Sequence, residues 1–136
     1  MKKSTHAEAG EGADHAIPAE HRLERLALEP VVQQLAGEGL VVSVDTMRAS
    51  VARAALDQGA AIINDVSAGL ADEAMLQVVA EAGVDYIAMH WRGHGAGMND
   101  LAHYGQVGEE VMAELQARID AALAAGEIVG IFPEGA

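Results

Sequence analysis

The chain has 136 residues and a mass of 14.1 kDa, a size typical of one domain, and its hydrophobic residues (51%) include few aromatics (3%). The formal net charge of −13 argues against nucleic acid and anionic lipid surfaces as partners, because both require clustered Lys and Arg. The absence of Cys excludes disulfides, thiolate catalysis and sulfur-ligated metals.

The N-terminal part predicts a mobile loop followed by a helix. Residues 1–16 are rich in Ala, Gly, Glu, Asp and His without periodicity, and they carry no apolar stretch typical of a secretory signal. Pro18 and Glu20 suit a first helical turn, and Pro30 is expected to kink or restart that helix. No apolar run reaches membrane-spanning length, and with the Cys-free composition this predicts a cytoplasmic protein. We therefore expect a mobile loop over 1–16 and a folded domain over 17–136.

Strand and helix patterns then alternate along the chain. Apolar runs that follow helix-ending glycines predict strands at 40–44, 60–63, 84–89 and 127–131, and helical periodicity fills the segments between them. This alternation predicts an α/β fold of about four parallel strands joined by right-handed helical crossovers. The runs are apolar almost throughout, as expected for strands covered on both faces.

Polar side chains end three of these runs, at Asp45, at Asn64 with Asp65, and at His90. The carboxyl ends of parallel strands meet at one edge of the sheet, where such folds keep their chemistry, so we expect these side chains to lie together. Asp45 could cap the following helix, or it could bind an amidine or guanidine edge with two hydrogen bonds. Asn64 could serve a heterocycle with a donor and an acceptor, or satisfy the next loop, and Asp65 is expected to be structural.

The segment after the third run offers an anion contact and no convincing metal site. Arg92 could contact an anion or be an ordinary surface arginine, and the glycine-rich loop 93–97 could present backbone N–H groups to phosphate. His90 and His94 are separated by a glycine-containing loop instead of sharing a helix face, so we do not predict that they bind zinc, and we predict no metal ligands.

Three motifs together resemble dihydropteroate synthase, the pterin-binding enzyme of folate biosynthesis, in its actinobacterial style. They are S-V-D-T-M-R-A-S-V-A-R-A-A-L at 43–56, I-I-N-D-V-S-A-G-L-A-D at 62–72 and M-H-W-R-G-H at 89–94. The resemblance implies a transferase that joins p-aminobenzoate to 6-hydroxymethyl-7,8-dihydropterin pyrophosphate and releases pyrophosphate. It also implies a (β/α)8 TIM barrel, and because such a barrel needs ~250 residues we expect a partial one over 17–136.

The resemblance also implies roles for individual residues. Asp45 would bind the pterin ring nitrogens and act catalytically, because a fixed carboxylate stabilises the positive charge that develops as pyrophosphate leaves. Asn64 would share the same pterin edge, and Met89 would pack against the ring. Ser4 and Thr5 resemble the middle of the family's E-S-T-R-P-G-A loop, which positions p-aminobenzoate.

Several family segments differ or are absent. Lys3 and His6 stand where that loop has Glu and Arg, and Phe132 stands where the family has a second pterin-binding Asp. The family uses Mg²⁺, but the N-V-T-P-D-S-F segment that helps hold the metal and pyrophosphate is absent, as are the late S-R-K and R-V-H-D segments. We therefore expect a chain truncated at both ends that is incomplete as a catalyst by itself.

Two other functions remain open beside this one. The chain could be a non-catalytic pterin-binding remnant or truncated gene product, or a methyltetrahydrofolate-using methyltransferase of the same superfamily, which the D-T-M-R and M-H-W-R-G motifs fit less well. The expected partners are a pterin and p-aminobenzoate, with no nucleic acid or membrane. An active assembly would be a homo-oligomer that completes the barrel, because an isolated partial barrel leaves strand edges unpaired and prone to aggregate.

Overall fold

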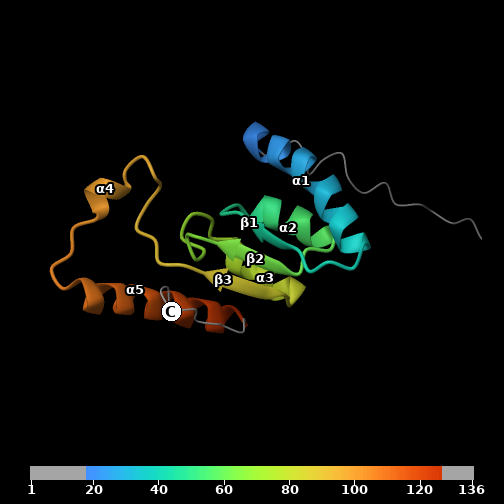
Figure 1. The fold of residues 1–136 in the computed structure, drawn as a ribbon. Coiled ribbons are helices and arrows are strands. Elements are labelled where there is room, and N and C mark those ends of the chain that lie inside the picture. The colour runs from blue at the N-terminus through green and yellow to red at the C-terminus, as the bar shows by residue number, and fades with distance from the viewer. Residues whose placement is uncertain (1–17, 127–136) are drawn as a thin grey trace, which may run out of the picture.

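The computed structural model describes residues 18–126, which form a three-stranded parallel sheet and its connecting helices (Figure 1). The strand order is β1-β2-β3, with no strand inserted between sequence neighbours. The predicted loop over 1–16 and the predicted strand at 127–131 lie outside the described residues. The elements in chain order are α1 (Ala19–Gly37), β1 (Ser43–Asp45), α2 (Ala49–Asp57), β2 (Ile62–Asp65), α3 (Met75–Ala82), β3 (Asp85–Ala88), α4 (Met98–Leu101) and α5 (Val107–Ala125).

The register of the sheet aligns the carboxyl ends of the strands. Asp45 of β1 lies opposite Asn64 of β2, and Asn64 lies opposite Ile87 of β3. All the pairing is parallel, so the predicted parallel arrangement is confirmed for the described strands. The strand ends that carry the candidate residues therefore meet at one edge.

Only one face of the described sheet is covered by helices. Val44, Ile63 and Tyr86 are buried in the core with side chains from α2 and α3, whereas the alternating positions Asp45 and Asp85 are exposed. The expectation of strands covered on both faces is therefore wrong for these residues. The physical reason is that three strands do not close on themselves, so no opposite strand covers the second face.

The helices follow one another around the covered side of the sheet. In Figure 1, α1 lies on the β1 side of the sheet and α5 runs along the β3 side.

Gly59 precedes β2 with a φ of 99°, and a Cβ there would lie 3.0 Å from the Ala36 Cβ of α1, so glycine is needed for both conformation and close approach. Gly83 ends α3 with a φ of 63°, as its position predicts.

Helix α1 continues through Pro30, so the expected restart there is wrong. Leu28 and Val32 on either side pack against the core, and this packing holds the helix across the lost backbone hydrogen bond. The short helix α4 was not predicted, because four residues are too few to show a helical period. No helix within residues 18–126 has the length and apolar character needed to cross a bilayer.

Candidate functional site

The ends of β1 and β2 bring two of the predicted residues into direct contact. Asn64 Nδ2 donates a hydrogen bond to Asp45 Oδ2 over 3.1 Å, and the pair lies on the sheet face that the helices leave open. Asp45 is exposed and Asn64 is half-buried. The pair, called the open pair below, therefore presents one carboxylate and one amide side by side at the carboxyl edge.

Asp45 does not cap helix α2, so that interpretation is wrong. The Ala49 backbone N–H at the start of α2 donates to Asp72 Oδ2 over 2.8 Å, and the Arg48 N–H donates to Thr46 Oγ1 over 3.2 Å. Asp72 comes from the loop between β2 and α3 and also accepts the Ala74 N–H over 3.1 Å. Other residues cap the start of the helix. Within residues 18–126, the hydrogen bond of the Asp45 side chain is the one that it accepts from Asn64.

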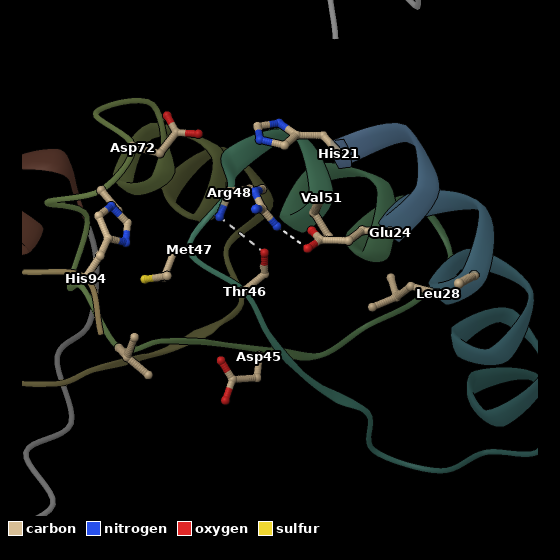
Figure 2. Close-up of a pocket in the computed structure, with 13 residues that line it drawn as sticks. His21, Glu24, Leu28, Asp45, Thr46, Met47, Arg48, Val51, Asp72 and His94 are labelled. Carbon is tan, nitrogen blue, oxygen red and sulfur yellow. Dashed lines mark hydrogen bonds and ion pairs between the residues drawn. The ribbon is translucent and has the colours of Figure 1, made fainter. Parts of the chain in front are cut away.

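A pocket of about 710 Å³ lies next to this edge. Figure 2 shows His21 of α1, Arg48, Asp72 and His94 around its upper part, and Asp45 apart from them below. Arg48 forms an ion pair with Glu24 of α1 inside the pocket, so its charge is already compensated. The pocket is lined by His21, Glu24, Ala27, Leu28, Asp45, Thr46, Met47, Arg48, Val51, Val66, Ala71, Asp72 and His94.

Asp65, directly after Asn64, points to the opposite face and serves the fold, as predicted. It is fully buried, and its carboxylate accepts hydrogen bonds from Ser67 N over 2.8 Å, Ser67 Oγ over 2.7 Å, Gly69 N over 2.8 Å and Tyr86 OH over 2.8 Å. A buried carboxylate that accepts four hydrogen bonds is stabilised in place. It has no surface left for a ligand.

His90 does not join Asp45 and Asn64, contrary to the expectation that all three strand ends lie together. The side chain turns to α5, where its Nε2 lies 2.7 Å from Glu114 Oε2. Since an ionised carboxylate only accepts, Nε2 carries the proton of this bond. The third strand end is therefore committed to a helix and not to the open pair.

The five N–H groups of Arg92 all have partners. Nε donates to Glu114 over 3.0 Å, Nη2 donates to Glu110 over 2.9 Å and to Glu114, and Nη1 donates to the carbonyls of Leu101 and His103 over 3.3 and 3.0 Å. Its Cζ also lies 3.9 Å from the centre of the Tyr104 ring. An anion could reach this guanidinium only if a carboxylate moved away.

These contacts change the acidity of the α5 carboxyls. Hydrogen bonds from Arg92 and then His90 lower the pKa of Glu114 from 4.5 to about 2. Hydrogen bonds from Arg92 and from the backbone N–H groups of Gln106 and Gly105 lower the pKa of Glu110. The same two carboxylates raise the pKa of Arg92. Glu110, Glu114 and Arg92 are therefore charged at neutral pH.

The remaining candidates are less closely tied to the open pair. Met89 is half-buried and follows the last residue of β3, while Ser4 and Thr5 lie outside the described residues. His94 packs edge-on against Trp91, with ring centres 5.1 Å apart. Between residues 18 and 126 no group of three or more His, Cys, Asp or Glu could hold a metal ion. We derive no step through the expected Mg²⁺.

Three residues that organise the site were not among the predicted ones. Asp72 caps a helix 23 positions earlier in the chain, and Glu110 and Glu114 hold Arg92 from α5. A visible signal existed for the glutamates, because their spacing of four places both on one helix face. Nothing local in the sequence indicates which basic residue they contact.

The chain matches a known protein family and its members. The family model described as "Pterin binding enzyme" matches residues 7–128, a range that includes the three motifs that carry the resemblance. A dihydropteroate synthase of Mycobacterium leprae is 51% identical over 112 residues, which are 82% of this chain and 39% of that protein.

Solved structures agree with this match. The fold is similar to dihydropteroate synthase from Thermus thermophilus in complex with 6HMPPP, with a TM-score of 0.72 and 41% identity over 79% of this chain and 43% of that one. It is also similar to the Xanthomonas albilineans enzyme in complex with 7,8-dihydropteroate, with a TM-score of 0.66 and 38% identity over 83% of this chain and 39% of that one. The chain thus spans about two fifths of the length of these relatives.

Proposed function

The chain belongs to the family of pterin binding enzymes, and we propose that it supplies the pterin-binding edge of a dihydropteroate synthase. That transferase joins p-aminobenzoate to 6-hydroxymethyl-7,8-dihydropterin pyrophosphate in folate biosynthesis. The observation that carries the proposal is the contact between Asp45 and Asn64 on the open sheet face. The similarity to dihydropteroate synthases solved with 6HMPPP and with 4-aminobenzoate supports it.

The chemistry of the pair suits a pterin. The aminopyrimidinone edge of a pterin carries N–H donors beside a carbonyl acceptor, so a carboxylate can accept two hydrogen bonds while an amide serves the next position. In this assignment, Asp45 accepts hydrogen bonds from the N–H groups of the pterin, and Asn64 binds the adjoining position on the same edge of the ring. When pyrophosphate leaves, the Asp45 carboxylate stabilises the positive charge that develops on the ring, and this is its catalytic role. Met89 packs against the ring.

The other substrate and the anion are assigned to weaker candidates. Ser4 and Thr5 contact p-aminobenzoate in this proposal, on the strength of the loop motif alone. Arg92 serves an anion only in a rearranged state, because all of its donors are occupied. Arg48 is likewise paired with Glu24. Both arginines near this edge are therefore compensated by carboxylates of the same chain.

A binding measurement tests the proposal. In titration calorimetry with 6-hydroxymethylpterin, we expect the chain to bind and Asp45→Asn to weaken binding about 100-fold, because the neutral amide both removes a charge and replaces an acceptor by a donor. Asp85→Asn is the matched control, since Asp85 is an exposed carboxylate on the same face at the other end of β3. Equal affinity of the Asp45→Asn chain and the control would overturn the proposal.

A turnover measurement distinguishes a complete catalyst from the alternative, a non-catalytic pterin-binding remnant. With Arg48 and Arg92 both paired, the described residues offer pyrophosphate no free arginine at this edge, so we expect no measurable condensation by the chain alone. Turnover that is abolished by Asp45→Ala would show the opposite and establish a complete catalyst. The measurement is product formation from pterin pyrophosphate and p-aminobenzoate, followed chromatographically.

We also propose where the protein acts and what completes it. The Cys-free composition suits a reducing compartment, and we assign the protein to the cytoplasm. Within residues 18–126, β1 pairs on one side only, which leaves a row of backbone groups open. We propose that a second copy covers this edge. Light scattering at several protein concentrations tests this, and a constant monomer mass would refute it.

A further inference from the structure

The segment that leaves β3 is held to α5 by one carboxylate. Glu114 accepts hydrogen bonds from His90 over 2.7 Å and from Arg92 over 3.0 Å, so two residues that are two positions apart converge on the same side chain. Arg92 extends the contact to Glu110, which also receives the N–H groups of Gly105 and Gln106 over 2.6 and 2.9 Å. The cluster thus holds the two ends of the segment that connects β3 to α5 close to each other.

The pleat of β3 relates this contact to the open face. Tyr86 and Ala88 face the core, and Ile87 between them lies opposite Asn64 on the open face. His90 continues the helix-facing series, because it contacts α5. β3 ends at Ala88, and the same alternation carried one residue further along the chain places Met89 in series with Ile87. The bond from His90 to Glu114 restrains this part of the segment.

We propose that Glu114 and Arg92 are positioning residues, which orient Met89 toward the pterin through His90. This role rests on the proposed function, since it gives Met89 a pterin to face. Neither residue touches the substrate in this proposal. The fork of Arg92 and its place over the Tyr104 ring keep Glu114 in the rotamer that His90 needs.

A second contact of α5 lies outside this cluster. Arg118, one turn further along α5, donates through Nε to the carbonyl of Ala68 over 2.9 Å. A variant at Glu114 retains both partners of this second contact. This separation lets a variant at Glu114 test local positioning.

Trp91 provides a direct reporter, because it is the only tryptophan of the chain and lies between His90 and Arg92. We expect Glu114→Gln to shift the emission of Trp91 and to weaken binding of 6-hydroxymethylpterin about tenfold, with a urea unfolding midpoint at neutral pH only slightly below that of the parent. Arg92→Lys is the second variant, and it should give the same shift because an ammonium cannot replace the fork.

Two controls delimit the effect. Glu110→Gln removes one partner of Arg92 but leaves the bond between His90 and Glu114, so its effect should be smaller. Glu81→Gln breaks an exposed ion pair between α3 and α2, in which the Arg53 nitrogen lies 2.9 Å from the Glu81 oxygen. This ion pair lies away from the segment after β3, so the variant should change neither signal.

The outcomes separate the two proposals. Binding by the parent chain that Glu114→Gln and Arg92→Lys leave unchanged, with unchanged Trp91 emission, would overturn the positioning role alone. Absence of binding by the parent chain would overturn the proposed function and the positioning role with it. An equal change in Glu81→Gln would show a general loss of stability and would also overturn the positioning role.

Discussion

At the carboxyl ends of β1 and β2, Asp45 and Asn64 contact each other and can still form further hydrogen bonds, whereas the neighbouring polar groups already have a full set of hydrogen-bond partners. Asp65 is buried with four donors around it, and Arg92 uses all five of its N–H groups. In contrast to the open pair, we call the groups around Asp65 and Arg92 the closed clusters. Saturated clusters stabilise the fold, while a polar group left unsaturated on an exposed face is available to a ligand.

The Asp65 cluster gives the largest expected effect. Asp65→Ala leaves the Tyr86 hydroxyl, Ser67 and the Gly69 N–H without their buried acceptor, and we expect a loss of about 4 kcal/mol in the free energy of unfolding. Tyr86→Phe is the matched control and removes one of these bonds, for about 1 kcal/mol. Urea unfolding measures both. A loss in Asp65→Ala no larger than in Tyr86→Phe would break the distinction between closed and open groups.

Asn64→Asp disrupts the open pair, because it places a second carboxylate where the Asn64 amide now lies 3.1 Å from the Asp45 carboxylate. The two like charges repel each other, and we expect this repulsion to lower the free energy of unfolding by about 1 kcal/mol at neutral pH. Protonation of either carboxyl removes the repulsion, so the deficit should shrink in acid. Urea unfolding at pH 7 and pH 4.5 checks it against Asn64→Ala, and a deficit independent of pH would contradict the prediction.

Asp72→Ala tests whether the open pair is kept free by other residues. The substitution removes the acceptor of the Ala49 N–H at the start of α2, so we expect a loss of about 1 kcal/mol in stability. The adjacent Glu73→Ala, at an exposed position, should have no measurable effect. Thermal unfolding compares the two variants. If Asp72→Ala were as stable as Glu73→Ala, the helix start would not depend on Asp72 and Asp45 would return as a candidate cap.

The Arg92 cluster gives the smallest effect, because its carboxylates are partly exposed to solvent. The pKa of Glu114 is lowered from 4.5 to about 2, so its stabilisation is complete above pH 4.5 and is lost as the pH falls from 4.5 toward 2. We expect the urea midpoint of the parent to fall more steeply over this window than that of Glu114→Gln. Parallel pH dependence in both chains would show that the cluster does not contribute.

Local patterns were enough to predict the three described strands and the longer helices, although not α4. The glycines before β2 and β3 have the left-handed conformation expected of helix ends, and the strands they precede are parallel and in sequence order. The strand bounds shifted by one to three residues at their starts, because pairing with a neighbour decides where a strand begins. The restart of the helix at Pro30 and the coverage of both sheet faces were mispredicted, since both depend on packing between distant elements.

By itself the sequence determined that Asp45 and Asn64 would adjoin, because both end consecutive parallel strands and the crossover between them is short. Only the tertiary structure decided what each polar side chain contacts. Asp72 caps a helix that begins 23 residues earlier, and Glu114 holds Arg92 from 22 residues away, so neither contact is encoded by local spacing. Such contacts depend on how helices pack around the sheet, and that packing is what leaves the open pair free.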